Sequence, residues 1–340
     1  MKVLITGIAG FVGSTISRMF LEHNNNIDII GVDNLSFGYE ERISDLLDRV
    51  NFINMDVKSL HELDVSNIDV IIHCAAIAPL PECQKNIFKC IEQNVAMCGA
   101  ISDFATKIGC ENVIFFSSGA VYEGSGDKVC SETDDIDTAL IYPTSKHLAE
   151  KLFSSVASTY GIKVVSIRLF NLYGPQQDYF RKQPPLLGYL LKSVIEEDDI
   201  TLYASENAKR DYIYIDDLYD LINKIIIRMP HIEKGKHIVV NAASGSAYSV
   251  YDIVETLERV IGKEINYNRG DKSKFWDKYP ELFDKKIPFK KQYIVNEVDK
   301  KSIADISFAK EYFNWIPKYT MESGLKECFD FAKTHLTKLS

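Results

Sequence analysis

Tyr142 and Lys146 carry the most informative chemical signal in the sequence. Residues at this spacing lie on one face of a helix, and an ammonium group beside a phenol favours the phenolate, which lowers the tyrosine pKa from about 10. The same spacing is common on solvated helix faces. Upstream, however, a run of β-branched and aromatic residues ends in the hydroxyls of Ser117 and Ser118. Side chains at the carboxyl end of a strand lie where open α/β sheets bind ligands, so the sequence predicts a proton-transfer site.

Three glycines near the N-terminus predict a dinucleotide site. Gly7, Gly10 and Gly13 directly follow the strand-like run Lys2–Thr6 and open a helical pattern. In that context they allow a tight turn, a close approach of the backbone to a pyrophosphate, and close packing of the helix on the sheet. Asp33 ends the next strand-like run, 20 residues after Gly13. Its carboxylate can bind the adenosine ribose and would repel a 2′-phosphate, which favours NAD over NADP; a turn cap is the alternative for this residue.

The elements that position these residues alternate between strand and helix. Runs rich in Val, Ile and Phe on both faces are typical of strands buried between two helix layers. The alternation predicts a Rossmann-type α/β fold with a doubly wound parallel sheet. The expected strands are Lys2–Thr6, Asp28–Val32, Asn51–Met55, Val70–Cys74, Asn112–Ser117 and Lys163–Leu169, and the expected helices are Val12–Glu22, Glu40–Leu47, Phe88–Ile108 and Thr144–Tyr160.

The pattern changes after Leu169, which predicts a smaller α/β lobe for the substrate. A turn leads into a helix that begins at about Pro185, and a helix at Asp217–Arg228 with a strand at His237–Asn241 indicates that the main sheet resumes. The expected domains are an NAD-binding domain of residues 1–170 with about 215–243, and a substrate-binding lobe of residues 171–214 and 244–340.

Composition and charge exclude several classes of protein. The 340 residues are 46% hydrophobic and 26% charged, the balance of an ordinary globular protein. A net charge of −9 disfavours nucleic acid and anionic membranes as partners. The longest apolar run is far shorter than the roughly 20 residues of a membrane span, and the N-terminus resembles no signal peptide, so we expect a cytoplasmic protein. The seven cysteines lack metal-ligand spacing, and no metal site is expected.

Taken together, the motifs resemble the extended short-chain dehydrogenases/reductases, and among them the nucleotide-sugar epimerase/dehydratase group. The resemblance covers nearly the whole chain. Besides the glycine loop, Asp33, Ser117-Ser118 and the Tyr142/Lys146 pair, it rests on Cys74-Ala75-Ala76, Asn94-Val95, the stretch Arg168–Pro175, the stretch Arg210–Asp217, and Ala304–Lys310 followed by Trp315-Ile316-Pro317.

The resemblance implies a role for each matched residue of the reaction and cofactor sites. Tyr142 exchanges a proton with a sugar hydroxyl, and Lys146 lowers its pKa and holds the nicotinamide ribose. Ser118 hydrogen-bonds the reacting oxygen, with Ser117 as the alternative. For Asp56, a candidate for the adenine edge, and for Asn94, a helix cap is the alternative. The implied NAD contacts are Gly7, Gly10, Phe11, Val12, Gly13, Asp33, Asn34, Asp56, Val57, Ala75, Ala76, Asn94, Ser117, Tyr142 and Lys146.

Substrate contacts are implied in the same way. Asn171 contacts the substrate diphosphate, and Arg210 pairs with phosphate, for which a guanidinium is well suited. A surface ion pair is the alternative for Arg210. The family's arginine shortly before the closing motif is replaced by Val295, and Arg269 is a candidate to take its place. The implied set is Ser118, Tyr142, Asn171, Arg210 and Arg269.

Departures from the family pattern affect the expected substrate more than the chemistry. The family's dehydratases carry Thr-Asp-Glu where this chain has Ser118-Gly119-Ala120, so the acid and base that eliminate water are missing. Glu123 replaces a usual glycine, and Ala75–Gln84 contains two prolines. Residues 270–301, rich in Lys, Asp and aromatic side chains, are expected to form a long, partly structured insertion.

The resulting functional expectation is an NAD-dependent epimerase that inverts C4 of a nucleotide-diphosphate sugar through a 4-keto intermediate. The alternatives are a nucleotide-sugar 4-dehydrogenase or 4-ketosugar reductase with the same site, and a non-catalytic NAD-binding protein. The resemblance also implies a homodimer, in which Phe88–Ile108 and Thr144–Tyr160 pair with their copies in a four-helix bundle.

Overall fold

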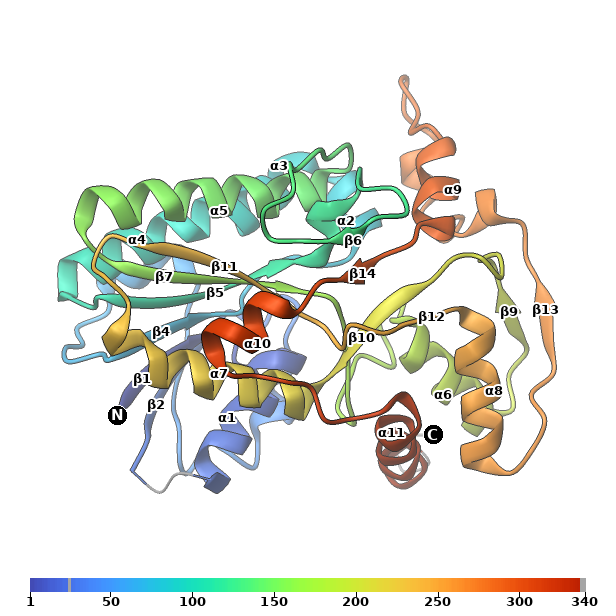
Figure 1. Ribbon diagram of the computed structural model, residues 1–340, viewed down its shortest axis with the longest axis horizontal. Helices are drawn as coiled ribbons and strands as arrows, with labels where there is room; N and C mark the ends of the chain where they lie inside the picture. The colour runs from blue at the N-terminus through green and yellow to red at the C-terminus, as the bar shows by residue number, and fades with distance from the viewer. Residues whose placement is uncertain (24–25, 337–340) are drawn as a thin grey trace.

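The structure, a computed structural model, describes residues 1–23 and 26–336 and is organised around a large sheet (Figure 1). Its strands are β1 (Lys2–Thr6), β2 (Asp28–Asp33), β3 (Asn51–Asn54), β4 (Val70–His73), β5 (Asn112–Ser118), β7 (Lys163–Leu169) and β11 (His237–Ala242). They lie in the order β11-β7-β5-β4-β1-β2-β3, and all neighbouring pairs are parallel. The chain winds outward in both directions from the β1/β4 boundary. This topology confirms the predicted Rossmann-type, doubly wound α/β fold.

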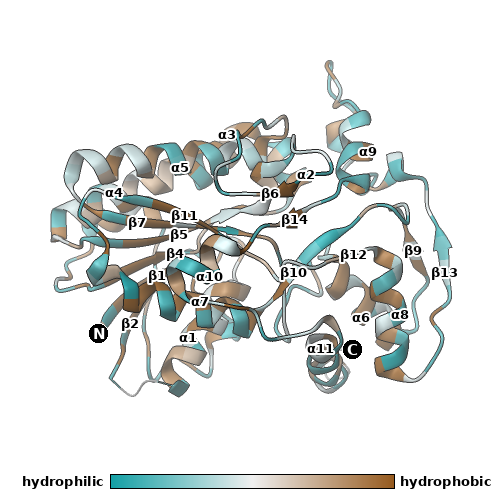
Figure 2. Ribbon diagram, viewed as in Figure 1, coloured by the Kyte–Doolittle hydropathy of each residue, from teal (hydrophilic) through white to brown (hydrophobic). Residues whose placement is uncertain are grey.

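Helices cover both faces of this sheet, and alternate strand residues face opposite layers. Val3 and Ile5 of β1 pack with Phe20, whereas Leu4 packs with Phe153 on the other side. Burial on both faces explains why the strands are nearly continuously apolar, as Figure 2 shows. In Figure 1, α4 and α5 lie on one side and α1 and α7 on the other. These helices are α1 (Phe11–His23), α4 (Met97–Ile108), α5 (Ile141–Tyr160) and α7 (Ile215–Arg228).

Two expected helices differ from the prediction. Glu40–Leu47 is not a helix but a single 3₁₀ turn, Glu40–Ile43, followed by other turns. Its buried residues, Ile43 and Leu46, are three apart, so the tighter turn brings both to the core while Leu47 stays exposed. The expected helix Phe88–Ile108 is divided into α3 (Ile87–Ile91), a π turn at Glu92–Ala96, and α4.

The smaller sheets and most of the remaining helices lie toward or beyond the carboxyl ends of the main strands (Figure 1). A three-stranded sheet has the order β12-β10-β8, and two pairs are formed by β13 with β9 and by β14 with β6. Helix α10 contacts α7 and β11, so this part of residues 244–340 lies against the main sheet. The bounds are β6 (Val129–Cys130), β8 (Asn171–Tyr173), β9 (Ile200–Leu202), β10 (Arg210–Tyr214), β12 (Ala247–Tyr248), β13 (Tyr267–Arg269), β14 (Ile303–Ala304), α2 (Leu80–Lys85), α6 (Leu186–Glu196), α8 (Val250–Ile261), α9 (Gln292–Asp299), α10 (Ser307–Phe313) and α11 (Met321–His335).

The segment 270–301 has a small core of its own. Trp276 and Tyr279, each 1% exposed, pack with Ile294 of α9. The same cluster includes Leu140, which directly precedes α5, and Leu80 of α2. The expected insertion is therefore folded, and it packs against the elements that precede Tyr142.

A separate finding concerns membrane spans. In residues 1–23 and 26–336, no helix combines the length and the apolar character that crossing a bilayer would require.

Candidate functional site

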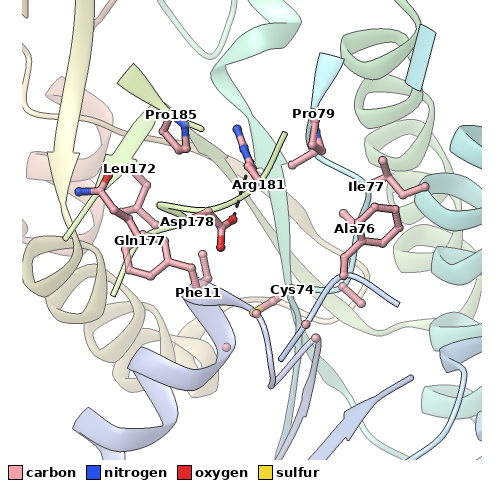
Figure 3. A pocket seen from close by; sticks show the side chains of 18 of the residues that line it. Phe11, Cys74, Ala76, Ile77, Pro79, Leu172, Gln177, Asp178, Arg181 and Pro185 are labelled. Carbon is pink, nitrogen blue, oxygen red and sulfur yellow. Dashed lines mark ion pairs between the residues drawn. The ribbon is translucent and has the colours of Figure 1, made fainter. Parts of the chain in front are cut away.

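A cavity of about 850 Å³ opens where the strand order of the main sheet reverses, at the carboxyl ends of β1, β2 and β4. Ligands of open α/β sheets bind at such a point. One side is formed by the β1–α1 loop and the segments after β2 and β4. The other side is formed by residues 171–187 and by Tyr279 of the insertion (Figure 3). The predicted site residues that line it are Gly7, Gly10, Phe11, Val12, Gly13, Asp33, Asn34, Val57, Ala75, Ala76 and Asn171.

The β1–α1 loop can exist in this form only with glycines at two of its positions. Gly7 has a φ of +71°, and a Cβ added there would lie 2.7 Å from the backbone nitrogen of Ala75. A Cβ at Gly13 would lie 2.2 Å from the carbonyl oxygen of Gly7, whereas one at Gly10 would keep 3.2 Å from the same oxygen. The loop leads directly into the N-terminus of α1, where backbone N–H groups and the helix dipole bind phosphate. These features fit the pyrophosphate of a dinucleotide.

Asp33 ends β2 at the edge of the cavity and is 8% exposed. Its carboxylate oxygens accept hydrogen bonds from the N–H groups of Ala9, at 3.0 Å, and Leu35, at 2.8 Å. Burial raises the pKa of this carboxyl, and the two N–H groups act in the opposite direction. The carboxylate is thus fixed at the position where a dinucleotide presents its ribose.

Asp56 lies just outside the cavity lining and caps a 3₁₀ turn at Val57–Glu62. Its carboxylate accepts from the N–H of Lys58 at 2.9 Å and from the side-chain amide of Asn34 at 3.1 Å. Asn34 and Val57 both line the cavity. The contacts of Asp56 in the structure are therefore those of a helix cap, which was the alternative role for this residue. Its contact with adenine stays a prediction.

Asn94 is buried in the π turn and does not line the cavity. Its amide oxygen accepts from the N–H of Ile77 at 2.8 Å, and its amide nitrogen donates to the Ile77 carbonyl and to the Ser145 hydroxyl, both at 3.0 Å. Asn94 therefore ties the cavity-lining segment after β4, which includes Ala75 and Ala76, to the helix that carries Tyr142. A direct contact with NAD stays a prediction.

Ser118 and Tyr142 come together beside the cavity, although neither lines it. Ser118 is the last residue of β5, Tyr142 lies in the first turn of α5, and their hydroxyls are hydrogen-bonded. Tyr142 packs against the cluster formed by Ile77, Cys83 and Cys90, of which Ile77 lines the cavity. Burial raises the pKa of Tyr142 to about 12, and the hydrogen bond with Ser118 acts in the opposite direction.

Lys146 is one turn further along α5 and is 3% exposed. Its ammonium donates to the Phe116 carbonyl at 2.8 Å and lies 6.0 Å from the centre of the Tyr142 ring. Burial lowers the pKa of Lys146. The lowering of the Tyr142 pKa that the sequence led us to expect is thus not found here: the phenol is desolvated, and the ammonium is directed to a backbone carbonyl.

Ser117, the alternative hydroxyl, faces a different set of partners. It donates to the Glu150 carboxylate at 2.5 Å, and Glu150 binds Arg168 through both carboxylate oxygens, at 3.0 and 2.8 Å. All three residues are buried. Ser117 therefore belongs to an ion-pair network beneath the site, and Ser118 is the hydroxyl of the pair that meets Tyr142.

The predicted substrate residues are not all brought together. Asn171 lines the cavity, and its side-chain amide donates to the Asp211 carbonyl at 2.7 Å. Arg210 does not line the cavity: its guanidinium donates to the carbonyls of Glu297 and Lys300 at the end of α9. Arg269 is exposed on β13 and pairs with Glu206 at 2.8 Å. Phosphate binding by either arginine stays a prediction.

The sequence analysis did not identify the charged residues on the substrate side of the cavity. Arg181, Asp178 and Lys182 line it together with Tyr279, and Glu82 lines the cavity from the segment after β4. Arg181 and Asp178 project from one loop into the hollow (Figure 3). The only signal in the sequence is a pair of adjacent basic residues in the loop before α6. Tyr279 comes from the insertion, whose packing no sequence pattern indicated.

The part of the chain that the structure describes contains no group of three or more His, Cys, Asp or Glu residues that could hold a metal ion. All seven cysteines lie within this part and are free thiols.

Comparison with known proteins agrees with this geometry. The family model described as "NAD dependent epimerase/dehydratase family" matches residues 3–241. A UDP-glucose 4-epimerase from Corynebacterium glutamicum is 30% identical over 78% of this chain and 82% of its own length. A UDP-glucuronate 4-epimerase from Thermodesulfobacterium geofontis is 25% identical over 98% of this chain and 96% of its own. In fold, the chain is similar to the crystal structure of the Thermotoga maritima UDP-glucose 4-epimerase with UDP-glucose, with a TM-score of 0.83, 24% identity, and coverage of 99% of this chain and 100% of that one.

Proposed function

Since the chain belongs to the NAD-dependent epimerase/dehydratase family, we propose that it inverts C4 of a nucleotide-diphosphate sugar, with UDP-sugars as the first candidates. The predicted family and the NAD cofactor are confirmed by the family match. The observation that carries the proposal is the Ser118–Tyr142 hydroxyl pair, with Lys146 next to it, beside a cavity that is lined by the glycine loop and Asp33.

The residues on the β1–α1 side fit NAD. The glycine loop and the N-terminus of α1 would hold the pyrophosphate, and Asp33 the adenosine ribose. When bound, NAD supplies a reversible acceptor for the hydride of the sugar carbon. No other part of the site has to change its oxidation state.

Tyr142 is the residue that takes and returns the proton of the 4-hydroxyl. Removal from water raises the pKa of its phenol to about 12, so deprotonation at neutral pH needs positive charge nearby. Arg181 supplies some of that charge, since it lowers the Tyr142 pKa. Ser118, hydrogen-bonded to the same phenol, would hold the reacting oxygen in line with it.

Dehydration is disfavoured by the residues that follow Ser118. Gly119 and Ala120 form a 3₁₀ turn there and offer no carboxyl group to eliminate water. The same site could serve a net dehydrogenase or a 4-ketosugar reductase. That outcome differs from epimerisation in whether NADH accumulates or disappears.

A panel of UDP-, dTDP-, GDP- and CDP-linked hexoses and uronic acids tests the proposal. Chromatography and proton NMR would resolve the C4 epimers, and absorbance would report NADH. We expect interconversion of one epimer pair without net NADH. Accumulation of NADH, or a requirement for added NADH, would instead establish the dehydrogenase or reductase. Absence of turnover on the whole panel would leave the non-catalytic alternative.

We also propose that the protein is a cytoplasmic homodimer. Phe88 on α3 and Leu148 and Tyr160 on α5 expose 77%, 45% and 68% of their surface, which gives these helices an apolar outer face for a second copy. Seven free thiols fit a reducing compartment. Light scattering at micromolar concentration should give twice the chain mass of 38.6 kDa, and a value near 38.6 kDa would refute the dimer.

A further inference from the structure

Arg181 stands out among the charged residues of the cavity because its charge is only partly satisfied. Its Nε donates to the Gln183 carbonyl at 2.6 Å, but Nη1 lies 3.7 Å from the Asp178 carboxylate, beyond hydrogen-bond distance. Asp178 is itself bound by Arg42. No acceptor among the described residues hydrogen-bonds either Nη atom of Arg181. Two donor groups of a permanent cation therefore face the cavity (Figure 3).

The neighbouring charges are already matched within the protein. Glu82 pairs with Lys85 at 2.9 Å, and Lys182 approaches Glu281 at 3.8 Å. Burial lowers the pKa of Arg181, which means that the surrounding protein alone does not stabilise the charged form of the guanidinium. A partly buried guanidinium that lacks hydrogen-bond acceptors is unfavourable in free energy. An anionic ligand that accepts these hydrogen bonds would offset this cost.

The position of Arg181 indicates where that anion lies on the substrate. Lys182, the next residue after Arg181, lies 4.2 Å from the centre of the Tyr279 ring, and Tyr279 packs in one cluster with Leu140, two residues before Tyr142. In keeping with this arrangement, Arg181 and Tyr142 influence each other's ionisation. In a hexopyranose, C5 and its substituent are next to C4, whereas the diphosphate is attached across the ring at C1. An anion beside the residue that serves C4 is best supplied by a carboxylate on C5, as in a uronic acid.

We infer that Arg181 binds an anionic oxygen group of the substrate at the Tyr142 end of the cavity. The group is the carboxylate of a nucleotide-linked uronic acid or an oxygen of the diphosphate, since both suit the two free donor groups of a guanidinium. This inference rests on the proposed function, because it assumes that a nucleotide sugar occupies the cavity. It makes Arg181 a specificity-determining residue.

Calorimetry on the NAD-loaded protein can separate the two sources of the anion. UDP, UDP-glucose and UDP-glucuronate would be titrated into the wild type, Arg181→Gln and Arg181→Lys. If the product panel identifies another nucleotide, the three corresponding ligands with that nucleotide would be used instead. If the carboxylate is the ligand, Arg181→Gln weakens the uronic acid on the order of tenfold or more and leaves the other two unchanged. If the diphosphate is the ligand, all three ligands weaken together. Arg181→Lys keeps the positive charge but not the two parallel donor groups of the guanidinium, so its affinities should lie between those of the wild type and Arg181→Gln.

A matched control removes the same charge outside the cavity. Arg259 on α8 pairs with Glu322 at 3.6 Å, and Arg259→Gln should change none of the three affinities. The inference is overturned if Arg181→Gln binds all three ligands like the wild type, or if Arg259→Gln reproduces its effect. Normal NAD affinity and circular dichroism would show that the variants are folded. These binding results do not depend on turnover, so a protein that binds as expected but fails the product panel would contradict the proposed function alone.

Discussion

The two sides of the cavity differ in whether the backbone or the side chains form the surface. On the cofactor side, the shape is set by the backbone: Gly7 and Gly13 leave no room for a Cβ, and the Asp33 carboxylate is held by two N–H groups. On the substrate side, the surface consists of long side chains, notably Arg181 and Tyr279, that come from a loop and an insertion. A backbone surface accepts one ligand shape, whereas a side-chain surface can change its ligand by substitution without a change of fold.

The proton-transfer residues lie between these two regions. Ser118 and Tyr142 belong to the main α/β unit through β5 and α5. Yet the insertion packs on Leu140, and Arg181 influences the ionisation of Tyr142. The residues of the proposed proton transfer therefore belong to the main α/β unit, and they are influenced from the substrate side by the insertion and by Arg181.

Tyr142→Phe should have the largest effect on activity and the smallest effect on ligand binding by the cofactor side and the substrate side. The phenol oxygen is the proposed proton acceptor, and positioned acid–base groups contribute about 10²–10⁴-fold. Phenylalanine keeps the ring, so NAD and sugar-nucleotide affinities should stay within about twofold. Tyr160→Phe, on the same helix but 68% exposed, is the matched control. If Tyr142→Phe keeps more than a tenth of the wild-type kcat, Tyr142 is not the base.

Gly13→Ala tests the backbone side. The added methyl group would meet the Gly7 carbonyl oxygen at 2.2 Å, so the loop or α1 must move. We expect loss of measurable NAD affinity and destabilisation of about 1–3 kcal/mol. At Gly10 the corresponding distance is 3.2 Å, and Gly10→Ala should weaken NAD less and unfold at a higher temperature than Gly13→Ala. Equal NAD affinity and Tm for the two variants would argue against a shape set by the backbone.

Trp276→Ala tests the substrate side, because Trp276 belongs to the core of the insertion that holds Tyr279 in place. Trp276 is 1% exposed and stacks on Phe289 at 5.5 Å, and truncating such a residue costs about 3–5 kcal/mol in the surrounding unit. Because this core belongs to the insertion, KM for the sugar nucleotide should rise while NAD affinity is retained. Ile287→Ala, in the same segment but 88% exposed, should change neither. Loss of NAD binding in Trp276→Ala would show that the two sides are not separable.

The cofactor side could be predicted from the sequence because its constraints are local. A tight turn, a close backbone approach and a helix start fall within Gly7–Gly13, and Asp33 follows at the end of the next strand. The strand pattern was equally clear because burial on both faces leaves apolar runs. The helix expected at Glu40–Leu47 failed because only Ile43 and Leu46 needed burial, which a 3₁₀ turn achieves.

The substrate side could not be predicted because its residues meet only through packing. Tyr279 reaches the cavity because the insertion folds around Trp276, and residues 270–301 show no periodicity that would reveal this. Arg210 was expected at a phosphate, but the end of α9 offers it the carbonyls of Glu297 and Lys300. For Arg181, the only signal in the sequence is the adjacent basic residue Lys182, which does not by itself indicate a binding site.

The last prediction, Asp33→Ser, should have the smallest effect because it changes preference rather than function. The fixed carboxylate should favour NAD by binding the ribose hydroxyls and repelling a 2′-phosphate, and one charge-assisted contact corresponds to about tenfold in affinity. Asp33→Ser should therefore bind NAD about tenfold more weakly and bind NADP more tightly than the wild type, as measured by calorimetry. Asp45→Ser makes the same change at an exposed residue paired with Arg18 and should leave both affinities unchanged. If Asp33→Ser keeps the wild-type preference, the cofactor side selects its ligand by backbone shape alone, and the side-chain charge at Asp33 plays no part in that selection.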